Sequence, residues 1–259
     1  MTATEPTPGS FRRRFIDGEL IVGTFIKTPT THATEILGSL GFDFVVVDEE
    51  HAPFDRVATD MVLLAARAAG TAGLVRVPEP SAAAIQAVLD CGATGVLVPH
   101  VDSPAKAAAM VEACRYRGGK RGFSNSPRAG RYGQARMWDH VAASDAAVTA
   151  IAMIEDPPAL DVIDAIVAVE GLDGVFIGRG DLTVALRASE TGAAEVVEAT
   201  GRIARAARSA GKAVAAMVGT IEEARWLREL GASCFIVASD QGFLRQAAAR
   251  ALADFKTLA

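Results

Sequence analysis

The residues best suited to chemistry lie in the segment 44–55, which reads FVVVDEEHAPFD. An apolar run of the kind that forms a buried strand is followed there by Asp48, Glu49, Glu50 and His51. Because burying unpaired charge costs free energy, these side chains are expected where the strand leaves the core. Histidine exchanges a proton near neutral pH, and a nearby carboxylate can orient its ring. The segment therefore predicts acid–base chemistry centred on His51.

Other apolar runs also end in ionisable residues. The motifs LVRVPEP, LVPHVD, AMIEDPP and FIGRGDL place these side chains at such ends: Arg76, His100, Asp102, Glu155, Asp156, Arg179 and Asp181. Glu155 and Asp181 follow consecutive runs. Two carboxylates, with the remaining positions left to water or substrate, suit Mg2+ or Mn2+. A pair of solvated or helix-capping carboxylates is the alternative.

Two basic side chains in this set are open to more than one interpretation. The guanidinium of Arg76 closes an apolar run, and its planar fork suits a substrate carboxylate. An ion pair between Arg76 and a carboxylate of residues 48–50 is the alternative. His100 is interpreted as a structural histidine rather than a catalyst.

The elements that must position these residues are short apolar runs alternating with amphipathic segments. Eight runs are predicted as strands: residues 20–27, 43–47, 73–77, 95–99, 149–154, 174–177, 213–217 and 234–238. Most are continuous rather than alternating, which is typical of parallel strands covered by helices. Helices are predicted at residues 56–69, 82–91, 104–116, 159–169, 195–210, 222–230 and 242–258.

Eight strand–helix units in a chain of about 250 residues predict an α/β protein, a single-domain (β/α)8 TIM barrel. The carboxyl ends of its strands would meet at one mouth. A doubly wound open sheet is the alternative, but residues 28–31 (TPTT) stand where that fold has a glycine-rich loop. We expect a mobile N-terminal segment at residues 1–12 and the barrel domain at residues 13–259.

Composition narrows the class of protein. Half of the 259 residues are apolar, enough for a large core, and the net charge of −5 argues against nucleic acid or an anionic membrane as a partner. No apolar run reaches transmembrane length, and the N-terminus lacks an apolar signal core. The three cysteines have no CxxC spacing and are expected to be reduced thiols of a cytoplasmic protein.

One segment, 118–133, breaks the alternation of strands and helices with the sequence GGKRGFSNSPRAGRYG. Basic residues gather around it, in the range 115–131. Long polar loops are often functional, although a solvated insertion is the alternative. The loop follows a helix, so it is expected away from the carboxyl ends of the strands.

At these motifs the chain resembles the HpcH/HpaI aldolases, which are class II pyruvate aldolases of the phosphoenolpyruvate/pyruvate-barrel superfamily. The resemblance extends from about Phe15 to the C-terminus. It is carried by FDFVVVDEEHAPFD, LVRVPEPSAAAIQAVLDCGATGVLVPHVDS, ACRYRGGKRGF with PRAGRYG, IEDPPALDVIDAIVAVEGLDGVFIGRGDLTVAL, and GASCFIVASDQGFL. Several motifs in the same order make the resemblance specific.

The resemblance implies a role for each matching position. His51 matches the family's general base and Asp48 its dyad partner. Arg76 matches the arginine that binds the keto-acid carboxylate. Glu155 and Asp181 match the two metal ligands, which implies a divalent cation, Mg2+ or Mn2+, with Co2+ as a further candidate.

Other matching positions would contact the substrate. The backbone at Gly180 and Asp181 matches the site of the pyruvate carboxylate, and Phe176, Met217 and Val218 match residues on the aldehyde side. Family members are typically hexamers, built as trimers of dimers, in which neighbouring subunits exchange the last helix. The resemblance therefore implies a homo-oligomer acting on small molecules, a keto acid and an aldehyde.

The implied reaction is the reversible retro-aldol cleavage of a 4-hydroxy-2-keto acid to pyruvate, or a close analogue, and an aldehyde. A cation and Arg76 would stabilise the enolate, and His51 would take the C4 hydroxyl proton. Lys27 and Lys212 are judged to lie outside the mouth, which argues against a Schiff-base aldolase.

Three positions depart from the family pattern. Met153 replaces a common glutamine, Arg179 a common proline, and Thr183 a common serine. The loss of an amide at Met153 removes a hydrogen bond near the keto acid, and Arg179 is expected to bring a charge near the metal loop. A related lyase that cleaves an acyl-CoA or decarboxylates a keto diacid is one alternative. A non-catalytic barrel used for binding or assembly is another.

Overall fold

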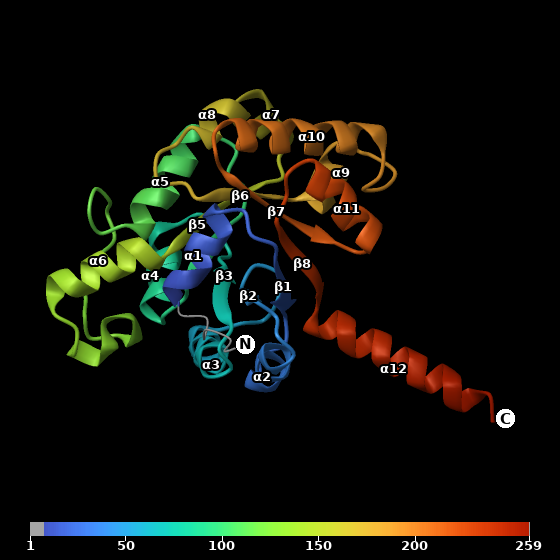
Figure 1. Ribbon diagram of the computed structural model, residues 1–259, viewed down its shortest axis with the longest axis horizontal. Helices are drawn as coiled ribbons and strands as arrows, with labels where there is room; N and C mark the ends of the chain where they lie inside the picture. Colours follow the sequence, from blue (N-terminus) through green and yellow to red (C-terminus); the bar gives the residue numbers. More distant parts are fainter. Residues whose placement is uncertain (1–7, 259) are drawn as a thin grey trace.

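Eight parallel strands form a closed barrel in the computed structural model, which describes residues 8–258 (Figure 1). Each strand pairs with the next along the chain, and β8 closes the barrel on β1. The strands are β1 (Ile21–Ile26), β2 (Phe44–Asp48), β3 (Ala72–Arg76), β4 (Gly95–Val98), β5 (Thr149–Ile154), β6 (Gly174–Ile177), β7 (Ala213–Val218) and β8 (Cys234–Ser239). The predicted TIM barrel is confirmed, with strand ends within one or two residues of the expected positions.

Most helices follow a strand and form the outer layer, except α1, which precedes β1, and α12, which extends away from the barrel (Figure 1). The helices are α1 (Pro8–Ile16), α2 (Thr31–Ser39), α3 (Arg56–Ala68), α4 (Ala82–Asp90), α5 (Pro104–Cys114), the short 3-10 helix η1 (Arg128–Gly133), α6 (Met137–Ala147), α7 (Pro157–Asp161), α8 (Ile163–Val167), α9 (Arg179–Ala185), α10 (Ala194–Ser209), α11 (Ile221–Glu229) and α12 (Asp240–Lys256). The single helix expected at 159–169 is two short helices, because Val162 leaves helical geometry at φ −121° and ψ 16°.

Two apolar clusters explain why the strands are apolar on both faces. One fills the barrel interior and includes Phe25, Val46, Leu74 and Met153. The other lies between the strands and the helices, and includes Val45 and the helix residues that face it. Successive side chains of a strand point to opposite faces, so alternate residues belong to alternate clusters. This alternation decides which residues after each strand face the mouth.

The amino end of the barrel is closed by α1. Phe11 and Phe15 of this helix are buried in the interior cluster, and Arg12 donates to the carboxylate of Asp173 at 2.7 Å. The boundary expected at residue 13 therefore falls inside a helix, and residues 8–12, expected in a mobile segment, are part of that helix. The remainder of the expected segment, residues 1–7, lies outside the described residues.

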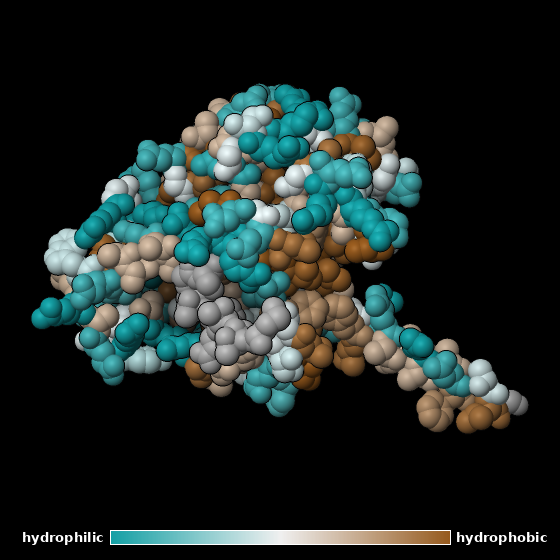
Figure 2. All heavy atoms as spheres, viewed as in Figure 1, coloured by the Kyte–Doolittle hydropathy of each residue, from teal (hydrophilic) through white to brown (hydrophobic). Residues whose placement is uncertain are grey.

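The last helix, α12, extends away from the barrel (Figure 1). None of its residues is buried, and the large side chains Leu244, Leu252 and Phe255 are exposed. Figure 2 shows apolar surface on the barrel beside the start of α12 and again toward the far end of the helix. Among the helices that the structure describes, none is long and apolar enough to cross a membrane.

Candidate active site

Strand alternation brings the charged residues of several strands together at the carboxyl end of the barrel. Phe25, Val46 and Leu74 point inward. The inward positions at the ends of β1, β2 and β3 are therefore Lys27, Asp48 and Arg76. By the same count Glu155 follows Met153 inward at the end of β5.

Asp48 and Arg76 form a buried ion pair at adjacent positions of β2 and β3. The Nε and Nη2 atoms of Arg76 donate to the two carboxylate oxygens of Asp48 at 2.9 and 2.7 Å. The Nη1 atom of Arg76 lies 3.3 Å from an oxygen of Glu50. Burial alone would raise the pKa of Asp48, but Arg76 and then Lys27 lower it to about 2. Arg76 is therefore held rigidly by two carboxylates, and Asp48 stays ionised.

Asp48 does not contact the His51 ring in the way the predicted dyad requires. Its carboxylate instead accepts the backbone N–H of His51 at 3.1 Å. The carboxylate nearest the ring is Glu50, whose Oε2 lies 3.6 Å from Nε2 of His51. The His51 side chain is 54% exposed, so the ring is accessible from the mouth. Asp48 thus fixes the start of the loop that carries His51, and Glu50 lies beside its ring.

Lys27 lies at the mouth, so the prediction that placed it outside the mouth is wrong. Its Nζ lies 2.6 Å from Oδ2 of Asp48, and its side chain is 26% exposed. The Phe25 ring lies beneath both cations, 5.8 Å from Lys27 Nζ and 4.7 Å from the guanidinium carbon of Arg76. The ammonium is engaged in an ion pair with a buried carboxylate, so Lys27 holds Asp48 rather than standing free as a nucleophile.

Glu155 is buried, with 2% of its surface exposed, and its surroundings disfavour its charge. Burial raises its pKa to about 7, with the carboxylates of Asp181 and Glu50 adding to the rise. The backbone N–H of His100 donates to its Oε1 at 2.9 Å, and Nδ1 of the His100 ring lies 3.6 Å from the same oxygen. Both contacts partly oppose the rise in pKa. A Cβ at Gly178 would stand 2.7 Å from Oε2 of Glu155, so glycine there leaves room for this carboxylate.

This donor set fits a divalent cation. A metal ion stabilises a buried carboxylate whose pKa is raised by its neighbours, and Mg2+ and Mn2+ prefer carboxylate oxygens. Across residues 8–258, no group of three His, Cys, Asp or Glu side chains is arranged to hold a metal. A cation held by Glu155 and Asp181 would therefore take its other ligands from water or substrate.

His100 belongs to the same cluster, although the sequence indicated only a structural role. Its Nδ1 lies 3.1 Å from Asp156, and its Nε2 lies 3.7 Å from Glu50. Burial would lower the pKa of His100, but Asp156, Glu155 and Glu50 together raise it. His100 also has a φ of 54°, an uncommon conformation for this residue. Its place directly after β4, in LVPHVD, is the signal that could have identified it.

The loop after β6, where a metal ligand was expected, differs from expectation in one respect. Gly180 and Asp181 are exposed in the first turn of α9, as a ligand site requires. Arg179 was expected to add charge near the metal. Its guanidinium instead donates to Glu223 at 3.2 Å and to the Thr191 carbonyl at 2.9 Å. It also stacks over Trp226, 5.3 Å from the ring, so its charge is paired toward α11.

The side chains expected to contact the substrate do not all point toward the mouth of the barrel. Met153 and Phe176 lie in the barrel interior beneath the charged residues. Met217 is the next inward position of β7 and is 44% exposed, as a side chain lining the mouth would be. Val218 points outward and is buried against the helices, so the structure contradicts its expected place in the pocket.

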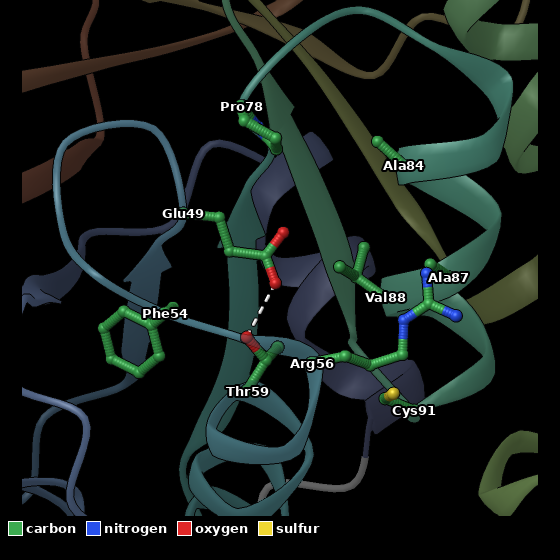
Figure 3. A pocket seen from close by; sticks show the side chains of 9 residues that line it. All are labelled: Glu49, Phe54, Arg56, Thr59, Pro78, Ala84, Ala87, Val88 and Cys91. Carbon is green, nitrogen blue, oxygen red and sulfur yellow. Dashed lines mark hydrogen bonds between the residues drawn. The ribbon is translucent and has the colours of Figure 1, made fainter.

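Glu49 also points away from the mouth. It lines a cavity of about 220 Å3 between α3 and α4, together with Arg56, Pro78 and Cys91 (Figure 3). Thr59 donates to its carboxylate at 2.6 Å. Burial raises the pKa of Glu49, and Thr59 and Arg56 oppose that rise. Of the four ionisable residues in DEEH, Glu49 is therefore separate from the site.

Known proteins resemble this chain over nearly its whole length. It is 34% identical to 5-keto-4-deoxy-D-glucarate aldolase of Escherichia coli (strain ATCC 8739), covering 96% of this chain and 97% of that protein. The enzyme of the same name from Salmonella gallinarum is 35% identical, over 95% of this chain and 96% of its own length.

Solved structures agree with these relatives. An HpcH/HpaI aldolase/citrate lyase family protein from Burkholderia cenocepacia J2315 superposes with a TM-score of 0.91, 30% identity, and coverage of 96% of this chain and 99% of that one. The citrate synthase SbnG superposes with a TM-score of 0.87, 29% identity, and coverage of 96% and 98%. The profile of the HpcH/HpaI aldolase/citrate lyase family matches residues 22–247. The resemblance in sequence motifs is therefore confirmed, and the chain is a carbon–carbon lyase that belongs to the HpcH/HpaI aldolase/citrate lyase family.

Proposed function

We propose that the mouth of the barrel catalyses the reversible, metal-dependent cleavage of a 4-hydroxy-2-keto acid to pyruvate, or a close analogue, and an aldehyde. The observation that carries this proposal is the division of charge across the mouth. Glu155 is buried among other carboxylates on one side, and the cations Arg76 and Lys27 flank Asp48 on the other. A keto acid needs both halves, because its keto oxygen and its carboxylate develop or carry negative charge.

Glu155 and Asp181 are the proposed ligands of the divalent cation, Mg2+ or Mn2+, and Co2+ is a further candidate. When bound there, such an ion polarises the keto oxygen and stabilises the negative charge of the enolate. Arg76 supplies the second positive contact. Its fork is already fixed by Asp48 and Glu50, so binding a substrate carboxylate requires little further ordering.

His51 is the proposed base for the C4 hydroxyl proton. Its ring is accessible, and the nearby Glu50 can stabilise the imidazolium that forms. His100 is less suited to that task, since carboxylates raise its pKa and favour its protonated form. Asp48 takes part by positioning Arg76, Lys27 and the backbone of His51, rather than by orienting the His51 ring.

The part of the pocket that contacts the substrate is proposed to favour a different aldehyde from the one that the common family residues would bind. Met153 supplies a buried thioether where the family commonly has an amide, and Met217 lines the mouth with an apolar surface. The relatives named 5-keto-4-deoxy-D-glucarate aldolase make acidic sugar derivatives the first compounds to examine. The cation Lys27 suits an aldehyde that carries a carboxylate.

The direct test supplies the enzyme with Mn2+ or Mg2+, pyruvate, and either a neutral or a carboxylate-bearing aldehyde. Aldol product detected by mass spectrometry, together with metal-dependent proton exchange at the pyruvate methyl group, is the expected result. His51→Ala should lower turnover while pyruvate still binds. Absence of both product and methyl exchange with every aldehyde would refute the proposed reaction and favour the lyase that acts on an acyl-CoA or decarboxylates a keto diacid.

We also propose that the enzyme acts as a cytoplasmic homo-oligomer in which α12 packs on a neighbouring subunit, with a hexamer as the expected form. The large exposed side chains of α12 support this, because a long helix with no buried residue gains little from its own barrel. The three free cysteines fit a reducing compartment. Sedimentation of the wild type against a Leu252→Asp, Phe255→Asp variant tests the assembly, and an unchanged sedimentation coefficient would refute it.

A further inference from the structure

A second polar cavity, of about 440 Å3, lies at the opposite end of the barrel from the candidate active site. Its walls include Ala72 and Gly73 of β3, and Thr94 and Val148, which directly precede β4 and β5. These residues stand at the amino ends of their strands. The rest of the wall comes from α3, α4, α6 and the loop that contains η1. The volume is in the range of ordinary small-molecule sites.

Four arginines line this cavity, which is unusual in a protein with a net charge of −5. Two of them are largely buried in its wall. Arg121 donates to Asp90 and to the Ser144 hydroxyl, both at 2.9 Å. Arg128 donates to Asp60 at 2.6 Å. The Nε atoms of both arginines are buried and have no hydrogen-bond partner within residues 8–258.

The other two arginines are exposed and line the same cavity. No carboxylate within residues 8–258 forms an ion pair with Arg67 of α3 or with Arg131 of η1. Asp60 and Asp90 pair with Arg128 and Arg121, so two of the four guanidinium groups form no ion pair with the described residues. Burial and Arg121 lower the pKa of His140, which also lines the cavity, and the carboxylates of Asp90 and Asp145 oppose that shift.

The loop holds Arg128 in a defined position. Gly130 packs so closely on Asn125 that any side chain at position 130 would overlap its backbone. The backbone N–H of Gly133 donates to the carbonyl of Asn125 at 2.7 Å and closes the loop. The side chain of Arg128 lies over Gly92, where a Cβ would stand 3.0 Å from its Cδ. Donors held in place this way bind an anion at a low entropic cost.

We infer that this cavity binds a small phosphorylated molecule through Arg67, Arg131 and the inner arginines. Guanidinium groups form charge-assisted, bidentate hydrogen bonds with phosphate oxygens, and arginines from several elements can contact a tetrahedral dianion from several directions. Arg67 and Arg131, which pair with no carboxylate among the described residues, supply two positive charges for one phosphate dianion. This assignment accounts for the basic loop 118–133, which the proposed aldolase reaction does not use, and it is independent of that reaction.

The test is calorimetric titration of the metal-loaded enzyme with inorganic phosphate at constant ionic strength. The Arg67→Ala, Arg131→Ala double variant should bind phosphate at least about tenfold more weakly, because two donors of charge-assisted hydrogen bonds are lost. Both side chains are exposed, so the variant should fold. Arg136→Ala removes an exposed arginine that does not line the cavity, and it should bind as the wild type does.

Two further arms identify the site and the class of ligand. Phosphate binding should persist in Glu155→Gln, which disables the candidate metal site, and succinate should bind more weakly than phosphate. The inference is overturned if the wild type binds no phosphate, if the double variant binds as the wild type does, or if binding disappears in Glu155→Gln. Preferential binding of succinate would overturn the assignment to phosphorylated ligands.

Discussion

Two buried carboxylates, at opposite ends of the barrel, have opposite surroundings. Asp173, just before β6, is 5% exposed and is saturated with donors. It accepts hydrogen bonds from Arg12 at 2.7 Å, from Arg115 at 3.1 Å, and from the backbone N–H of Ala150 at 2.9 Å. Glu155, just after β5, is 2% exposed and accepts the His100 N–H while facing two other carboxylates.

In this barrel, the neighbours of a buried carboxylate distinguish a structural charge from a functional one. A buried carboxylate that is fully paired contributes to the fold, and removing it leaves its partners unpaired. A buried carboxylate crowded by other carboxylates destabilises the fold unless something positive joins it. Glu155 is of the second kind, which is why we interpret it as a metal ligand.

The largest expected effect follows from removing the crowded carboxylate. Glu155→Gln should abolish metal binding and lower turnover by about 10²–10³-fold or more, because stabilisation of the developing negative charge is lost. Metal titration and steady-state kinetics measure both effects. Glu49→Gln is the matched control, since Glu49 is a neighbouring carboxylate that points away from the mouth. Full metal affinity in Glu155→Gln would mean that the ligand assignment is wrong.

Removing Asp173, the paired carboxylate, should lower stability rather than turnover. Asp173→Asn leaves Arg12 and Arg115 without their carboxylate, and we expect the free energy of unfolding to fall by about 3–5 kcal/mol. Turnover per folded molecule should stay close to that of the wild type. Urea unfolding and kinetics on the same sample test this. If Asp173→Asn keeps the stability of the wild type but loses turnover, Asp173 is not a purely structural carboxylate, and its contrast with Glu155 is wrong.

The pH dependence of stability offers a third test, in the metal-free protein. The pKa of Glu155 rises from 4.5 to about 7 on folding, so the folded state holds its proton more tightly. The contribution of Glu155 to the free energy of unfolding is fully present below about pH 4.5. As the pH rises toward 7 that contribution is lost, and the free energy of unfolding falls by up to about 3 kcal/mol. The difference in unfolding free energy between wild type and Glu155→Gln isolates this effect. A difference that is constant between pH 4.5 and 8 would contradict the raised pKa.

The smallest expected effect concerns Lys27 at the carboxyl end. Lys27→Met removes one of the two cations that hold Asp48, and we expect kcat/KM to fall about 10–100-fold, more for a carboxylate-bearing aldehyde than for a neutral one. Lys27→Arg should restore part of the activity. Borohydride treatment in the presence of pyruvate should trap no adduct at Lys27. Unchanged kinetics in Lys27→Met would remove it from the proposed site.

The sequence alone was sufficient for the barrel and for most of the candidate site residues. Continuous apolar runs and the helices between them predicted all eight strands, because their pattern follows directly from burial on both faces. Asp48, Arg76 and Glu155 were identified because a strand of this kind ends in charge only where it leaves the core. Counting alternate residues past Phe25 would also have identified Lys27 as inward-facing.

Only the tertiary structure decided which charges pair. Asp48 contacts Arg76 and Lys27 from the strands on either side, and the His51 ring lies beside Glu50. His100 joins carboxylates from two other strands. The amino end follows the same rule, since the arginines around its cavity come from α3 and from a loop far along the chain. Ion pairs depend on distances of a few ångströms between side chains remote in sequence, and strand register and barrel closure set those distances.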